Sequence, residues 1–224
     1  MEDLRAQYKR LFVTGSNTER LVFFSDAVFA IAMTLLVIDL HVPEDPTGDA
    51  LEVITSQVGG FFAYALSFAI IALNWMSHHR KFRVIESHDG TLMFLDLALL
   101  FVVAFVPFPT SLLSTFGGER AAVVLYAFTV GLLGVLQFAI WTYAYRKGFV
   151  SRDVTEPLNR YLRVDQLSTP IVFWGTIPIA LFWDGTVAMY AWFLLFPVGW
   201  IGGAIQRRIA RNADAASPPE QQRR

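Results

Sequence analysis

Six long apolar stretches, each near the length of a membrane-spanning helix, constrain this 224-residue chain more than any other feature. A helix needs about 20 mostly apolar residues to cross the hydrocarbon core of a bilayer. The expected spans are about 21–41, 55–78, 91–114, 120–144, 167–184 and 187–206. Only 17% of the residues are charged, against about 25% in a typical soluble domain. The sequence therefore predicts an all-α membrane protein with six transmembrane helices, of which the fifth is interrupted by Pro170 and Pro178.

The charges between these stretches predict an orientation, because Lys and Arg concentrate on the cytoplasmic side of membrane proteins. With six spans, every one of the 18 Lys and Arg residues except Arg120 falls on one side. The other side is acidic: Glu44, Asp45, Asp49, Glu52, Glu119 and Asp184. We therefore expect both termini in the cytoplasm, a transmembrane domain over 1–208, and a disordered cytoplasmic tail over 209–224, which is rich in Ala, Pro, Gln and Arg.

An R-x-x-x-F-S-D motif opens the first span. It consists of Arg20, Phe24, Ser25 and Asp26. Ionisable side chains inside a membrane are costly, so they usually face a protein interior or a water path. We favour a buried structural carboxylate for Asp26, paired with a cation. The candidate partners at the same end of the spans are Arg20, His78 and His79, and Asp96 enters the third span from that side and is a further candidate.

The first span also has an apolar stripe. At about 100° per residue, Ile31, Leu35 and Ile38 lie within about 60° of one another. Thr34 lies beside them, whereas Asp26 lies about 140° away from Ile31. By composition alone the stripe is an ordinary lipid or core contact, as in most membrane helices. The carboxylate on the opposite face argues against a helix that simply faces lipid.

Three motifs in order resemble one known family. The R-x-x-x-F-S-D motif runs into Ala27-Val-Phe-Ala-Ile-Ala-Met-Thr-Leu-Leu-Val. The second span ends in Asn74-Trp-Met-Ser-His-His-Arg-Lys-Phe82, and the third contains Pro107-Phe-Pro-Thr110. Together they resemble the prokaryotic members of the transmembrane protein 175 family, which are single-repeat, six-helix cation channels. The resemblance is dense in motifs from about 20 to 115 and rests on hydropathy beyond that.

The resemblance implies a homotetramer in a prokaryotic plasma membrane, with the first helix of each subunit lining a central potassium pore. It makes Ile31 the narrowest hydrophobic ring, Leu35 and Ile38 the next rings, and Thr34 the source of a hydroxyl near the constriction. No Thr-Val-Gly-Tyr-Gly filter sequence is present. The residues implied to hold the fold are Arg20, Phe24, Ser25, Asp26, Trp75, His78, His79 and Asp96. Asp96 stands where many relatives are expected to carry Asn, which adds an acid that could make the cluster sensitive to pH.

Two other classes of function remain open. A proton-coupled secondary transporter could use Asp26, His78 and Asp96 as a relay, although the two halves of the chain show no convincing repeat. An enzyme is disfavoured, since the chain has no Cys and the His78-His79 pair lacks carboxylates at ligand spacing. We expect no cofactor and no metal beyond permeating K⁺. The expected partners are lipid and monovalent cations, not nucleic acid.

Most of the tryptophans are interpreted as belts at the two membrane interfaces, with Trp75 a candidate to pack against the motif instead. They are Trp75, Trp141, Trp174, Trp183, Trp192 and Trp200.

Overall fold

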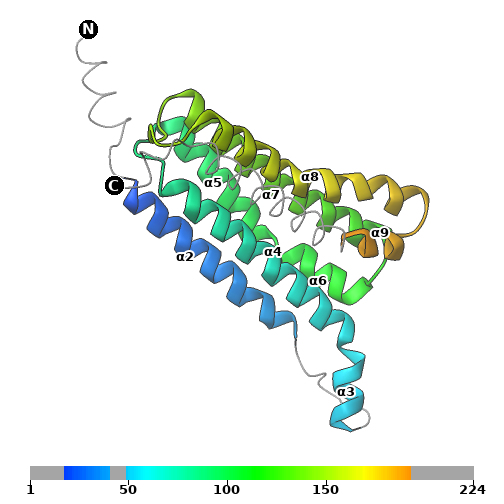
Figure 1. Ribbon diagram of the computed structural model, residues 1–224. Helices are drawn as coiled ribbons and strands as arrows, with labels where there is room; N and C mark the ends of the chain where they lie inside the picture. The colour runs from blue at the N-terminus through cyan, green and yellow to red at the C-terminus, as the bar shows by residue number, and fades with distance from the viewer. Residues whose placement is uncertain (1–17, 41–48, 193–224) are drawn as a thin grey trace, which may run out of the picture.

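The computed structural model describes residues 18–40 and 49–192, and every regular element in them is helical. In chain order these are α2 (Glu19–Leu35), the 3₁₀-helix η2 (Leu36–Asp39), α3 (Ala50–Ser56), α4 (Val58–Phe82), α5 (Gly90–Phe105), α6 (Pro107–Phe116), α7 (Arg120–Arg146), α8 (Glu156–Phe182) and α9 (Gly185–Ala191). Figure 1 shows the long helices packed side by side, with α2 along one edge and α3 projecting away from the bundle. The all-α prediction is confirmed.

Four segments of the described chain are long and apolar enough to cross a membrane. They are Glu19–Ile38, Val58–Phe82, Gly90–Phe116 and Arg120–Arg146. They correspond to the first four expected spans. The third consists of α5 and α6, which meet at Val106, just before Pro107. Proline has no N–H to donate, so the regular hydrogen-bond pattern is interrupted there, and the chain then continues as the α-helix α6.

The fifth expected span begins earlier than the hydropathy indicated. α8 starts at Glu156, so the helix includes part of the polar stretch between Arg146 and Arg163 that precedes the expected span. Pro157 in the first turn and the acidic Glu156 both favour a helix start at this point. The helix then runs through Pro170 and Pro178 without a break. Of the sixth expected span only α9 is described. The remainder, like the tail over 209–224, lies outside the described residues.

α7 lies at the centre of the bundle and packs closely against α8. Gly131 and Gly134 make this possible, because a Cβ at Gly131 would collide with the indole of Trp174, and one at Gly134 with the ring of Pro170. On its other side α7 is tied to α4 and α6 through a buried hydroxyl network. Ser67 Oγ lies 2.9 Å from Tyr126 Oη and 2.8 Å from Thr110 Oγ1. Such satisfied buried networks fix the relative positions of the helices that carry them.

The two ends of the bundle differ in charge. At one end Thr18 Oγ1 donates to Ile85 O at 3.3 Å, and Ile85 pairs with Val150, so the start of α2 and the ends of α4 and α7 meet there. We call this the cationic end, because it holds all the Lys and Arg of the described residues except one: Arg20, Arg80, Lys81, Arg83, Arg146, Lys147, Arg152, Arg160 and Arg163. Arg120 lies at the other end, where its guanidinium donates to Trp183 O at 3.4 Å.

Candidate functional site

A fully buried polar cluster joins α2, α4 and α5 about two turns from the cationic end. His78 Nε2 lies 2.8 Å from Asp96 Oδ1, and neither side chain is exposed. Ser25 Oγ donates to Asp96 Oδ2 at 2.8 Å and lies 2.9 Å from Leu21 O. An ionised carboxylate can only accept, so an ionised Asp96 requires His78 Nε2 to be the donor in this contact. Both carboxylate oxygens are thus satisfied by protein groups, as a buried acid requires.

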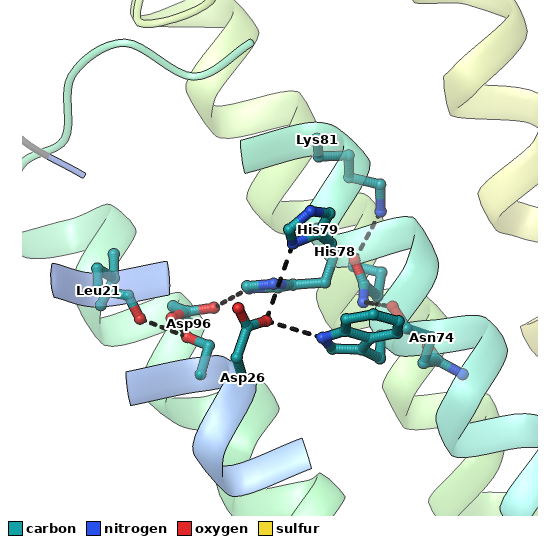
Figure 2. A network of polar contacts seen from close by, with 10 residues as sticks. Leu21, Asp26, Asn74, His78, His79, Lys81 and Asp96 are labelled. Carbon is teal, nitrogen blue, oxygen red and sulfur yellow. Dashed lines mark hydrogen bonds and ion pairs between the residues drawn. The ribbon is translucent and has the colours of Figure 1, made fainter. Parts of the chain in front are cut away.

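A second polar cluster lies beside the first and is half-exposed. Trp75 Nε1 donates to Asp26 Oδ1 at 2.7 Å, and His79 Nδ1 lies 4.0 Å from the same oxygen. In Figure 2 the ring of His79 faces Asp26, while His78 points toward Asp96. The consecutive residues His78 and His79 therefore lie beside different carboxylates, those of Asp96 and Asp26. The cluster that the sequence suggested is two clusters with separate acids.

The expected candidates divide accordingly. His79 is near Asp26, and Asp96 is partnered by His78 and Ser25. Arg20 is exposed and, in the part of the chain that the structure describes, is not among the hydrogen-bond or ion-pair partners of Asp26. Phe24 of the motif is exposed as well. The Trp75 contact was anticipated as packing, and the structure adds a hydrogen bond to a carboxylate, which is among the stronger classes of hydrogen bond.

The opposite face of α2 is exposed. Ile31 is 58% exposed, Leu35 40% and Ile38 67%, whereas Phe29 and Ala32 on the inner face are buried. Thr34 is also exposed, and its Oγ1 donates to Ile31 O at 2.8 Å, which leaves the oxygen lone pairs directed outward. The structure places the stripe and Asp26 on different faces of the helix. The roles of these four residues in a pore stay predictions.

The start of α5, and with it the position of Asp96, is set by an acidic cap. Asp89 Oδ1 accepts from Leu92 N at 2.9 Å, and Asp89 Oδ2 accepts from Tyr143 Oη of α7 at 2.7 Å. Partial burial raises the pKa of Asp89. The hydrogen bonds from Leu92 and Tyr143 and the positive charge of Lys147 outweigh that effect and hold the pKa below its usual value of 3.8. An acid at a helix start is stabilised further by the helix dipole.

Some polar contacts had no clear signal in the sequence. Lys81 Nζ donates to Gln137 Oε1 at 2.6 Å, and Gln137 Nε2 donates to Asn74 O at 3.1 Å, which links α4 to α7 (Figure 2). The position of Lys81 at the end of a span predicts a charge exposed at the membrane surface, so its burial could not be expected from the sequence. Within the described residues no group of three or more His, Cys, Asp or Glu could hold a metal ion.

The interface-belt interpretation is wrong for two tryptophans. Trp141 and Trp192 are buried, and their indole N–H groups donate to Asn159 Oδ1 and Thr176 Oγ1 of α8. Trp183 is exposed. Trp200 lies outside the described residues.

Comparison with known proteins relates this architecture to one family. A model described as "Endosomal/lysosomal potassium channel TMEM175" matches residues 20–107, which include both polar clusters and the stripe. A potassium channel of Streptomyces collinus is 33% identical over 196 residues, covering 82% of this chain and 95% of that protein. The chain belongs to the TMEM175 family.

More distant members extend the comparison. An endosomal/lysosomal proton channel TMEM175 of Danio rerio is 26% identical over 158 residues, which are 68% of this chain but only 30% of that protein. The crystal structure of a lysosomal potassium-selective channel TMEM175 homolog from Chamaesiphon minutus superposes with a TM-score of 0.69. That match covers 85% of this chain and 98% of the other, at 24% identity, and shows that the fold is shared.

Proposed function

We propose that this TMEM175-family chain is the subunit of a potassium-selective cation channel, a homotetramer whose α2 helices line a central pore. The observation that carries the proposal is the asymmetry of α2. One face is fixed to α4 and α5 by Trp75–Asp26 and Ser25–Asp96 hydrogen bonds, while the branched stripe on the other face is exposed. The name of the Streptomyces collinus relative, a potassium channel, supports the same function.

The stripe supplies a physical mechanism for gating. Four copies of Ile31 around an axis would form a constriction without hydrogen-bonding groups, from which water withdraws when the pore is narrow. Leu35 and Ile38 would add rings on the same side of the helix. An isoleucine ring has no oxygen to replace an ion's hydration shell, so the four Thr34 hydroxyls are the polar groups closest to the constriction. Potassium would be the permeant ion, and no cofactor or catalytic residue is required.

The subunit would cross the plasma membrane of a prokaryote six times, with the cationic end and both termini in the cytoplasm. The charge distribution supports this orientation, since Arg120 is the single basic residue at the other end among the described residues. The transmembrane domain would comprise 1–208, followed by a cytoplasmic tail over 209–224.

Reconstitution tests the proposal directly. The purified protein is fused into planar bilayers under a potassium–sodium gradient, and the reversal potential is measured. We expect unitary currents with a reversal potential near that of potassium, and a tetramer by native mass spectrometry. Saturable flux without unitary currents, or a reversal potential that follows the chloride or sodium gradient, would reject a potassium channel.

A proton pathway is the second candidate, and the buried His78–Asp96 pair favours it. The Danio rerio relative is named a proton channel. Measuring the reversal potential at fixed potassium concentrations and varied pH gradients separates the two functions. The reversal potential of a proton conductance shifts with the pH gradient, whereas that of a potassium conductance does not.

A further inference from the structure

A groove between α4 and α8, with α7 as its floor, contains two cavities. One, of about 310 Å³, is lined near the cationic end by Lys81, Trp141 and Leu158, among others. The other, of about 250 Å³, extends toward the middle of the bundle. The two cavities are adjacent, because Ser77, Arg80 and Gln166 line both, and we call them together the α4–α8 groove. Neither the motif clusters nor the stripe of α2 contributes to it.

Two cations of α4 line this groove. Lys81 is only 4% exposed, and Gln137 holds its ammonium in place at 2.6 Å. Arg80 is exposed, and the hydrogen bond that its Nε donates to Met76 O uses none of the terminal N–H groups of the guanidinium. The first turns of α8 carry Arg160 and Arg163 against Glu156 and Asp165, so the excess positive charge beside the groove comes from Arg80 and Lys81 of α4. This region of the cationic end is therefore net positive.

Gln166 is the unexplained group in the groove. Its side chain is 8% exposed and lines both cavities, yet neither Nε2 nor Oε1 has a hydrogen-bond partner. Buried amides of this kind are rare in folded proteins, and each requires an explanation such as an absent ligand or ion. The amide can donate to an anionic oxygen and accept from a hydroxyl.

The second cavity has a mixed lining, with the polar Asn74, Gln137, Ser168 and Thr169 beside apolar side chains that continue toward the middle of α4 and α8. Ile70, Leu73 and Phe173 line it, with Gly134 of α7 in the same cavity wall. Ile70 lies ten residues before Arg80 on α4, a distance of about 15 Å along a helix. The groove is thus cationic where it approaches the membrane surface and more apolar toward the bilayer centre, which is the polarity of a phospholipid. Basic pockets between membrane helices at the cytoplasmic side bind anionic headgroups.

We propose that the α4–α8 groove is a binding site for an anionic phospholipid from the leaflet at the cationic end. The phosphate lies between the side chains of Arg80 and Lys81, and the Gln166 amide donates to one of its oxygens. One acyl chain follows Leu73 and Phe173 toward the bilayer centre. The site depends on embedding in a membrane but not on potassium selectivity, so it is independent of the proposed function.

Lipid-dependent stability of the full-length detergent-solubilised protein tests this site. We expect phosphatidylglycerol to raise the melting temperature more than phosphatidylcholine does, and inorganic phosphate to have no effect. Arg80→Gln and Gln166→Leu should each weaken the apparent affinity for phosphatidylglycerol about tenfold, because each removes a hydrogen bond to a charged group. Arg83→Gln is the matched control. Arg83 lies three residues after Arg80 and carries the same charge, but its side chain lines neither cavity.

Four outcomes would overturn the proposal. Equal stabilisation by the two lipids, or equal loss in Arg80→Gln and Arg83→Gln, would show a diffuse surface effect. An equal response to inorganic phosphate would show a site for soluble anions. The natural chain has no Cys, so in a Ser77→Cys variant any disulfide between two copies must join these two positions. Such a disulfide would place a second subunit in the groove. Native mass spectrometry of the same variants, counting bound phosphatidylglycerol, checks the result without relying on thermal unfolding.

Discussion

His78 and Asp96 form a fully buried pair, with 2.8 Å between Nε2 and Oδ1. The other carboxylate oxygen accepts from Ser25, so this one acid connects α2, α4 and α5. Asp96→Ala would leave His78 Nε2 buried without its partner, whereas Ser25 Oγ can still donate to Leu21 O. We expect it to destabilise the protein by about 1–3 kcal/mol, the cost of one buried polar group left without a partner. Asp96→Asn keeps an acceptor for His78 and a donor for Ser25 and should cost far less. Melting temperatures of the three proteins in detergent measure the difference, and equal values for Ala and Asn would contradict this role of Asp96.

The Trp75–Asp26 hydrogen bond predicts a measurable coupling between α4 and α2. In a double-mutant cycle of Trp75→Phe and Asp26→Asn, we expect a coupling energy of about 1 kcal/mol, reduced by the partial exposure of the pair. Asp26→Asn should also lower the yield of assembled oligomer while leaving ion selectivity unchanged, since Asp26 faces away from the stripe. Trp174→Phe, which removes an indole donor to Phe128 O elsewhere, is the control and should show no coupling to Asp26. Normal assembly of Asp26→Asn with loss of potassium preference would place Asp26 in the ion path.

The close contact between α7 and α8 predicts different effects on stability for three Gly→Ala changes. Gly134→Ala should lower stability by about 1–3 kcal/mol, because its Cβ would meet the buried ring of Pro170. Gly131→Ala should cost less, since the half-exposed indole of Trp174 can move aside. Gly175→Ala has open space and removes a flexible residue from α8, so stability should stay equal or rise by up to about 1 kcal/mol. Thermal unfolding of the single variants checks the order, and an equal loss in all three would argue against close packing at these positions.

The cap at Asp89 predicts a pH dependence of stability. Its folded-state pKa is lower than the usual 3.8, so the cap stabilises the protein fully above that value and the contribution is lost as the pH falls through the folded pKa. Asp89→Asn still caps the helix but does not titrate. The difference in melting temperature between the natural protein and Asp89→Asn should therefore be largest near neutral pH and shrink below about pH 4. A difference that is constant between pH 3 and pH 7 would show that the charge of Asp89 is not involved.

The sequence identified the helices where apolar length alone decides them. The four long spans follow from hydropathy, but the polar first turns of α8 do not, because their stability comes from packing on α7 and from contacts such as Asn159 with Trp141. A hydropathy count treats an indole as apolar, so it also placed Trp141 at an interface and could not identify Trp75 as the donor to Asp26. These features depend on which helices are neighbours.

The candidate cluster shows the same limit. The spacing within one helix correctly separates Asp26 from Ile31, because both lie on α2 and the angle is fixed by helix geometry. The spacing could not divide His78 and His79 between Asp96 and Asp26, since that division depends on how α4 is rotated against α2 and α5. Arg20 was a reasonable partner for Asp26 by charge, but six residues along a helix turn it about 120° away. The α4–α8 groove has no motif at all and became visible only through packing.

The exposed stripe of α2 carries the strongest test of the channel. Ile31→Asn would place four amides at the proposed constriction, where they would stabilise water and lower the barrier to ions. We expect higher conductance and weaker discrimination between potassium and sodium in planar bilayers, with a smaller effect for Ile38→Asn. Ile171→Asn is the matched control, because Ile171 is an isoleucine of similar exposure on α8 that has no place in the proposed pore. If a tetrameric Ile31→Asn protein conducts as the natural protein does, or if Ile171→Asn has the same effect, then α2 does not line the pore. His78 and Asp96 would then be the residues to test for a proton pathway.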